Sequence, residues 1–283
     1  MTAQRIDGAA LAREKISQLK QIVATLQARG INPGLATVQV GDDAASRVYV
    51  RNKVRACSEA GVNSIHHDLP GASSEGDALI LLDQLNRDPK VHGIIVQLPV
   101  PKHLDARRLS QAIAVAKDVD GFNWQNLGAL VEGAPGILPC TPCAVMAMLD
   151  SAKIPVAGRH AVVVGRSNIV GKPVALLLIA RGGTVTVCNS RTPDLGAITR
   201  QADILVVATG KAALITRSMV KAGAAVIDVG INRLPDGRIT GDVAFDEVKE
   251  VAGWITPVPG GVGPMTVAML VENTINAALR SRQ

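Results

Sequence analysis

The sequence predicts an α/β protein of two domains, each built on a parallel sheet, and three features predict it. Apolar residues are 47% of the 283 residues and aromatic residues only 2%, so aliphatic side chains must build the core. Apolar runs such as LATVQV (35–40) and GIIVQL (93–98) alternate with longer segments of helical periodicity. Two such alternating regions flank a segment rich in glycine and proline, residues 116–142. Both the aliphatic composition and the alternation are typical of buried parallel strands that are covered by helices.

The first half of the chain carries a local signal for each element. Asp7 can cap a helix that runs to Arg29, and Gly30 follows its end. The further elements expected are a strand over 35–40, a helix over 44–60, a strand near 63–69, a helix near 75–87, a strand over 93–98 and a helix near 105–115. This succession predicts parallel strands, because each strand is followed by a helix that can cross back over the sheet.

The second half repeats the alternation after the glycine- and proline-rich segment, in which a short helix near 124–131 is expected. The elements expected are a helix over 143–152, a strand over 161–165, a helix over 171–181, a strand over 184–188, a helix over 194–201, a strand over 203–208, another helix and a strand over 224–230. LPDGR (234–238) is typical of a hairpin turn, and ITPVPGGVGP (255–264) should be irregular before a final helix over 265–281.

The composition excludes several classes of protein. The net charge is +6 and the pI about 9.4, but the basic residues are scattered and aromatic residues are too few for base stacking, which argues against nucleic-acid binding. No apolar run reaches the roughly 18 residues of a membrane span, and the N-terminus lacks the apolar region of a signal peptide. We therefore expect a cytoplasmic enzyme with no membrane partner.

The four cysteines are too few for a disulfide scaffold in a chain of this size. Cys140 and Cys143 form a C-x-x-C pair, but no second pair of ligands follows at a zinc spacing. We interpret the cysteines as incidental and expect no metal, with a redox pair as the alternative.

A dinucleotide site is indicated where AVVVG (161–165) runs into RSNIVGKPVA. A strand, a glycine turn and a helix start follow one another there, and the N–H groups and partial positive charge of a helix start suit a phosphate. The turn has Gly165, Arg166 and Ser167 followed by Gly171, which is not the G-x-G-x-x-G pattern. By itself such a turn is equally compatible with a purely structural role.

The next strand indicates which dinucleotide. In an NAD site an acidic residue after the second strand binds the ribose 2′-hydroxyl. Here TVTVC (184–188) is followed by Asn189, Ser190 and Arg191, without an acid. Ser190 and Arg191, helped by Arg166, suit a 2′-phosphate instead, because a guanidinium presents a planar fork of donors. This favours NADP over NAD, although Arg191 could equally be a solvated loop residue.

A second group of polar residues accompanies the helix over 44–60. Ser46, Tyr49 and Lys53 fall on one face of that helix. Most helical lysines are simply solvated, but Gln97 ends a strand of apolar residues, at the edge where open α/β sheets bind ligands. Asp118 and Asp120 follow in a loop, where a carboxylate can accept from substrate N–H groups or serve ordinary turn chemistry with Gly121.

These segments together resemble the methylenetetrahydrofolate dehydrogenase/cyclohydrolase family, the bacterial bifunctional FolD type, over almost the entire chain. The resemblance rests on SRVYVRNK (46–53), VHGIIVQLPVP (91–101), KDVDGFN (117–123), PCTP (139–142), VVGRSNIVGKPV (163–174), VIDVGIN (226–232) and TPVPGGVGPMT (256–266). It implies two α/β domains around a cleft, a catalytic folate-binding domain of residues 1–138 plus 266–283 and a Rossmann-like NADP-binding domain of residues 139–265. It also implies a homodimer.

The resemblance assigns roles by position. It implies that Lys53 is the cyclohydrolase catalytic residue, that Tyr49 lines the folate site, that Gln97 contacts and tunes the lysine and that Asp120 holds the pterin ring. Gly165, Arg166, Ser167 and Ser190 match cofactor-binding positions, and Ile231 falls near the nicotinamide. Pro259, Gly260 and Gly261 belong to the loop that lines the folate cleft.

The implied activity is oxidation of 5,10-methylenetetrahydrofolate by NADP, followed by hydrolysis of the methenyl product to 10-formyltetrahydrofolate. A monofunctional NAD-dependent dehydrogenase of the same fold is the nearest alternative, and a non-enzymatic dinucleotide sensor is a more distant one. The chain departs from the family pattern at Ala144, Asn189 and Trp124, which affects local cofactor geometry rather than reaction type.

Overall fold

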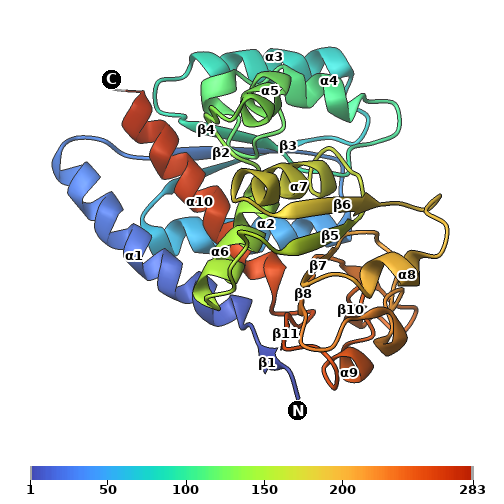
Figure 1. Cartoon of the computed structure of the whole chain (residues 1–283). Coiled ribbons are helices and arrows are strands. Elements are labelled where there is room, and N and C mark those ends of the chain that lie inside the picture. The colour runs from blue at the N-terminus through green and yellow to red at the C-terminus, as the bar shows by residue number, and fades with distance from the viewer. Residues whose placement is uncertain (1, 282–283) are drawn as a thin grey trace. The chain divides into compact units, whose positions relative to one another are not determined.

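The structure, a computed structural model, describes residues 2–281, apart from the side chains of residues 44–46, 48 and 49. The chain divides into two compact units (Figure 1). Unit 1 comprises Met1–Ala12 and Thr141–Thr266, and unit 2 comprises Arg13–Cys140 and Val267–Gln283. Among the described residues, no helix is both long and apolar enough to cross a bilayer.

Unit 2 is built on a three-stranded parallel sheet in the order β3-β2-β4. Its elements are most of α1 (Gly8–Ala28), β2 (Gly34–Val40), α2 (Ala44–Ala60), β3 (Asn63–Leu69), α3 (Glu75–Arg87), β4 (Gly93–Val96), α4 (Ala106–Gln111), the 3-10 helix η1 (Val115–Lys117), α5 (Trp124–Glu132) and most of α10 (Val262–Arg280). The strand and helix alternation expected for this half of the chain is confirmed.

Local chemistry explains where these helices begin. Asp7 accepts a hydrogen bond from Ala10 N at 2.9 Å before α1, as expected for a cap. Ser74 and Asp77 form a reciprocal capping box at the start of α3. Asn123 accepts from Gln125 N at 3.0 Å and starts α5.

The two faces of this sheet differ in chemistry. Alternate residues of β2 and β4, such as Val38 and Ile94, pack with Leu82 of α3 and Leu109 of α4 in one aliphatic core. The residues between them turn the other way, because side chains alternate along a strand. That second face buries three polar side chains, those of Thr37, Gln39 and Gln97. Buried polar groups on one face mark it as the face to search for chemistry.

Unit 1 contains a six-stranded parallel sheet in the order β1-β11-β8-β7-β5-β6 and an antiparallel pair, β9 and β10. Its elements are β1 (Gln4–Arg5), α6 (Cys140–Ser151), β5 (His160–Val164), α7 (Gly171–Ala180), β6 (Thr184–Cys188), α8 (Leu195–Thr199), β7 (Ile204–Val207), the 3-10 helix η2 (Arg217–Met219), β8 (Ala225–Asp228), β9 (Asn232–Arg233), β10 (Ile239–Thr240), α9 (Phe245–Val248) and β11 (Trp254–Ile255).

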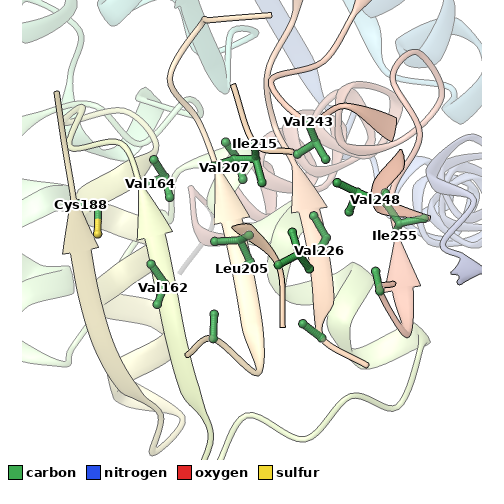
Figure 2. Packing of buried hydrophobic residues seen from close by; sticks show 14 residues of the cluster. Val162, Val164, Cys188, Leu205, Val207, Ile215, Val226, Val243, Val248 and Ile255 are labelled. Carbon is green, nitrogen blue, oxygen red and sulfur yellow. The ribbon is translucent and has the colours of Figure 1, made fainter. Parts of the chain in front are cut away.

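Figure 2 shows one core of unit 1, in which Val162, Leu205 and Val226 of neighbouring strands form a continuous aliphatic layer. Ile215 and Val243 join this layer from the loops that follow β7 and β10, and both are buried. The loops at this end of the sheet are therefore anchored to the core rather than loosely attached.

The structure corrects several expected elements. The segment between β7 and β8 holds only the 3-10 helix η2 where an α-helix was expected; Ala213, at φ +51°, departs from helical backbone inside it. The helix expected near 105–115 ends at Gln111, and α10 begins at Val262 rather than 265, since its proline lies in the first turn, where no N–H is needed. The hairpin turn at 234–238 is confirmed by the pairing of β9 with β10.

The first twelve residues were expected with the first half of the chain but group with unit 1. The reason is that β1 pairs in parallel with β11, with Gln4 opposite Trp254 and Arg5 opposite Ile255. Two residues of strand carry too little pattern to be recognised in a sequence. That residues 1–138 with 266–283 bind folate, and that residues 139–265 bind NADP, stays a prediction.

Candidate active site

A lysine and a glutamine meet on the polar face of the unit 2 sheet. Lys53 Nζ, on α2, donates to Gln97 Oε1 at 3.0 Å. Gln97 follows β4 and is only 8% exposed; its Nε2 donates to Leu98 O at 2.7 Å and its backbone N–H to Val38 O at 2.8 Å. Because the amide nitrogen already donates to a carbonyl, the oxygen must face the ammonium. Gln97 therefore aims one acceptor at Lys53 and holds its amine in place.

Cys57 lies one helical turn after Lys53 and is fully buried. Burial raises the pKa of the Cys57 thiol to about 12, and the nearby Lys53 charge offsets only part of that rise. The thiol is therefore un-ionised at neutral pH and does not form an ion pair with Lys53.

Asp120, also predicted for this site, lies in the loop between η1 and α5 in the same unit. Asp118 bridges in parallel to Ile94 of β4, so the chain that follows runs toward the end of the strand where Gln97 lies. Burial is the main cause that raises the pKa of Asp120; the charge of Lys53 opposes the rise and Asp118 adds to it. The charge of Lys53 therefore favours the ionised form of Asp120, and the charge of Asp118 disfavours it.

Asp118, two residues earlier, accepts hydrogen bonds from the chain around it. Its Oδ2 accepts from Asn123 N at 2.7 Å and from Asn126 Nδ2 at 2.9 Å, and the side chain is 1% exposed. Burial raises the pKa of Asp118, while these hydrogen bonds work against the rise. Asp118 thus fastens the loop to the start of α5. The choice of Asp120 as the carboxylate that holds the substrate stays a prediction.

The predicted side chains of Ser46 and Tyr49 lie outside the described residues, although the backbone of α2 is described through both positions.

The predicted cofactor residues lie in unit 1, where β5 ends. Gly165 has φ +132°, and a Cβ there would lie 2.3 Å from Ala208 O. A Cβ on Gly171 would lie 2.2 Å from Gly165 O. Both positions therefore require glycine, since the turn folds back closely on itself and on the residue after β7. The two glycines are therefore explained by the packing of the turn itself.

Ser167 changes the expected picture of a helix start with unpaired N–H groups. Its Oγ accepts from Val170 N at 3.1 Å and Gly171 N at 3.3 Å, and its carbonyl accepts from Lys172 N at 3.0 Å. The first amides of α7 are therefore occupied, and an anion at this turn would meet the exposed side chains of Arg166 and Ser167 instead.

Ser190 and Arg191 follow β6 and are both exposed. Asn189 shapes this turn: its Oδ1 accepts from Arg191 N at 3.0 Å, and its backbone N–H donates to Thr192 Oγ1 at 2.9 Å. The departure from the family pattern at Asn189 is therefore a turn cap. The side chains of Ser190 and Arg191 are free to meet an anion.

The remaining predicted residues also lie in unit 1. Ile231, just after β8, is 47% exposed, which is unusual for a large apolar side chain beside a buried strand end. Pro259 is exposed, and Gly260 has φ +100°. Gly261 is buried, where a Cβ would lie 2.4 Å from Pro257 O. The loop is a tightly packed turn before α10.

Two buried carboxylates in unit 1, Asp228 and Asp242, were not predicted from the sequence. Asp228 lies inside the VIDVGIN segment already noted, but nothing local distinguishes a buried aspartate from a solvated one. A glycine lies near each of them in the chain, Gly230 and Gly241, and each glycine packs against the other segment's carboxylate.

Comparison with known proteins agrees with this geometry. The model of the tetrahydrofolate dehydrogenase/cyclohydrolase catalytic domain matches residues 6–120, and that of the family's NAD(P)-binding domain matches residues 139–282. The chain is 58% identical over 280 residues to the bifunctional protein FolD of Moorella thermoacetica, covering 99% of this chain and 100% of that protein. It is 57% identical to that of Bordetella bronchiseptica, with 99% of both covered.

Solved structures show the same likeness. The bifunctional FolD enzyme of Campylobacter jejuni is 46% identical, with a TM-score of 0.97 over 98% of this chain and 99% of that one. The Trypanosoma brucei enzyme, solved in complex with NADP cofactor and inhibitor, is 40% identical, with a TM-score of 0.96 over 100% and 99%. With family models covering both halves and relatives this similar over nearly full length, the chain belongs to the tetrahydrofolate dehydrogenase/cyclohydrolase family.

Proposed function

We propose that this chain oxidises 5,10-methylenetetrahydrofolate with NADP and then hydrolyses 5,10-methenyltetrahydrofolate to 10-formyltetrahydrofolate. The observation that carries the proposal is the bond from Lys53 Nζ to Gln97 Oε1, beside Asp120. A monofunctional dehydrogenase has no need of an amine aimed in this way. The many relatives named bifunctional support the same conclusion.

The oxidation requires positioning more than proton transfer. NADP, when bound, supplies the acceptor for a hydride that leaves the bridging methylene carbon, and the two flanking nitrogens stabilise the resulting folate cation. The protein orients the two reactants, and such orientation is worth up to about 7–11 kcal/mol of the barrier. Asp120 would hold the pterin ring by accepting from its N–H groups.

The hydrolysis requires a proton to move. Water adds to the methenyl carbon and loses a proton; the carbon–nitrogen bond to one ring nitrogen then breaks, and that nitrogen takes up a proton. The Nζ of Lys53, held against Gln97 Oε1, would accept the proton that the water loses. Gln97 holds that amine in place and would return it to the same position after each turnover.

The cofactor side of the proposal assigns roles in unit 1. The turn that Gly165 and Gly171 shape presents the exposed side chains of Arg166 and Ser167, which suit a phosphate-bearing ligand. Arg166, Ser190 and Arg191 would bind the 2′-phosphate, since all three are exposed and no acidic residue follows β6 in its place. Ile231 would contact the nicotinamide side.

The proposal extends to organisation. Residues 1–138 with 266–283 would bind folate, where Pro259, Gly260 and Gly261 add to the folate site, and residues 139–265 would bind NADP. We also propose a cytoplasmic homodimer, as the family resemblance implies. Light scattering on the purified protein tests the dimer: a mass of one chain, 29.4 kDa, would contradict it.

One spectrophotometric experiment tests the function. Methylenetetrahydrofolate is mixed with enzyme and NADP or NAD while reduced nicotinamide and methenyl absorbance are followed together. We expect reduction of NADP with little methenyl accumulation, and Lys53→Met should slow hydrolysis by about 10²–10⁴-fold. Lys20→Met, which alters an exposed lysine on α1, is the matched control.

The outcomes separate the alternatives. Full hydrolysis by Lys53→Met would contradict the role of Lys53. Reduction of NAD in preference to NADP, with methenyl product accumulating in the wild type, would indicate the monofunctional NAD-dependent enzyme.

A further inference from the structure

Two carboxylates lie buried at the carboxyl end of the unit 1 sheet. Asp228, the last residue of β8, is 3% exposed, and Asp242, after β10, is fully buried. Burying a carboxylate is costly unless donors surround it. The donors that compensate this cost show which segments the pair holds together.

Asp242 collects donors from two loops that leave the sheet. Its Oδ2 accepts from Thr209 N, from Thr209 Oγ1 at 2.9 Å and from Gly210 N at 2.9 Å, all in the turn after β7. Its Oδ1 accepts from Asn232 Nδ2 at 2.8 Å, in the segment after β8. A single side chain therefore ties together the segments that follow two adjacent strands.

Asp228 fastens the segment that carries Asp242. Its Oδ1 accepts from Gly230 N at 2.9 Å and Asp242 N at 3.0 Å, and its Oδ2 accepts from Val243 N at 2.9 Å. Val243 is itself anchored in the aliphatic core (Figure 2). Asp242 is therefore held from both sides, by its neighbour in the core and by Asp228.

The two carboxylates are packed reciprocally against glycines. A Cβ on Gly230 would lie 2.2 Å from Cγ of Asp242, and a Cβ on Gly241 would lie 1.9 Å from Oδ2 of Asp228. Each carboxylate thus occupies the space where the other segment lacks a side chain. Side chains at these glycines would force the two segments apart, which makes the pair a built arrangement rather than an accident of packing.

The segments that Asp242 holds are those that border the cofactor residues. The turn at Thr209 and Gly210 directly follows Ala208, whose carbonyl faces the glycine turn at Gly165. Between Gly230 and Asn232, both tied to the carboxylate pair, stands Ile231 with its side chain exposed. Ligands of open α/β sheets bind at this end of the strands.

We infer that Asp242, held by Asp228, is a positioning residue for NADP. Asp242 sets the turn after β7 and the Ile231 segment in the arrangement that the nicotinamide half of the cofactor requires. The inference rests on the proposed function, because it takes NADP as the ligand of this edge. It adds two residues that would touch no substrate and act only through the loops they hold.

The test compares Asp242→Ala with a control from the opposite end of the same sheet. Asp203, before β7, accepts from His160 N at 3.0 Å and from Lys221 Nζ at 2.6 Å, so Asp203→Ala also removes a carboxylate with backbone and side-chain donors, although a partly exposed one. The readouts are KM and kcat for NADP, the KM for folate, the Tm rise on adding NADP, and hydrogen exchange of the amides of Thr209 and Gly210.

We expect Asp242→Ala to raise KM for NADP by about tenfold or more, to reduce the NADP-dependent Tm rise and to expose the Thr209 and Gly210 amides to exchange, with a much smaller change in the KM for folate. Asp203→Ala should lower Tm without any of these effects. If Asp242→Ala does not fold, Asn232→Ala, which removes one donor and leaves both carboxylates, should raise KM for NADP in the same direction. The double change Asp242→Asn with Asn232→Asp exchanges donor and acceptor and should restore binding.

Failure of the inference and failure of the proposed function give different results. A wild-type chain whose Tm does not rise with NADP would refute the proposed function. A wild type that responds to NADP, together with Asp242→Ala and Asn232→Ala variants whose KM for NADP matches that of Asp203→Ala, would overturn the positioning role.

Discussion

Asp118 and Asp120 are two residues apart, yet their replacement should have opposite signatures. Asp118→Ala removes the acceptor of the Asn123 N–H and one of the two acceptors of the Asn126 amide, which keeps Val115 O; both residues are buried. A buried donor that loses its partner costs about 1–3 kcal/mol, so the two cost about 2–6 kcal/mol before relief of the buried charge is subtracted. A net loss of about 2 kcal/mol would lower Tm by roughly 4–8 °C.

Asp120→Asn should behave differently. Burial raises the pKa of Asp120, so its ionised form is costly in the folded chain and a neutral amide of the same shape should leave Tm unchanged or higher. If Asp120 holds the pterin ring, this variant loses folate binding and turnover instead.

The assay measures Tm by calorimetry and both activities for the two variants, with Asp83→Ala as control. Asp83 forms only an exposed ion pair with Arg87 on α3, and its loss should change little. The reasoning is refuted if Asp118→Ala keeps the wild-type Tm, or if Asp120→Asn lowers Tm as much as Asp118→Ala while retaining activity.

Three further predictions concern other parts of the chain. Burial raises the pKa of Asp228 from 3.8 to about 6, so the folded state holds this proton more tightly than the unfolded state, and the resulting stability is lost as pH rises from about 4 through 6. Asp228→Asn should remove this pH dependence of the unfolding free energy, which amounts to about 3 kcal/mol; urea midpoints that vary with pH equally in both proteins would contradict this. Gly165→Ala should lower Tm by several degrees more than Gly158→Ala. Both glycines have positive φ, but only at Gly165 would the added Cβ lie 2.3 Å from a backbone oxygen, that of Ala208; equal Tm values would show that the turn can relax. Alkylation of the native chain at pH 7.5 should label Cys143 first, since the other three cysteines are buried and the pKa of Cys57 is about 12; early labelling of Cys57, found by peptide mass spectrometry, would mean that α2 opens readily.

The sequence by itself determined the layered α/β architecture, because periodicity is a local property. A continuous apolar run such as GIIVQL predicts a buried strand, and an aspartate before an amphipathic segment predicts a helix start. The structure places β4 and α1 accordingly. Gly165 and Gly171 were also recognisable, since a turn between strand and helix constrains its own residues.

The tertiary structure decided what depends on contacts distant in sequence. The bond between Lys53 and Gln97 joins residues 44 positions apart, and no local pattern shows that the two side chains meet. β1 and β11 exist only because they pair with each other and with β8, so their two-residue runs carry no signal of their own. The same holds for the 3-10 segment between β7 and β8, whose position follows from its neighbours.

The carboxylates show the physical reason most clearly. Asp118, Asp120, Asp228 and Asp242 have the same side chain, and in a sequence each has the same probability of lying in a turn or a site. Their roles differ because burial and donors differ: Asp118 holds a loop, Asp242 collects four hydrogen bonds from two segments, and Asp120 lies within the field of Lys53. Residue type supplies the charge, but only the folded chain decides how much water and how many donors surround it, and these determine what the charge can do.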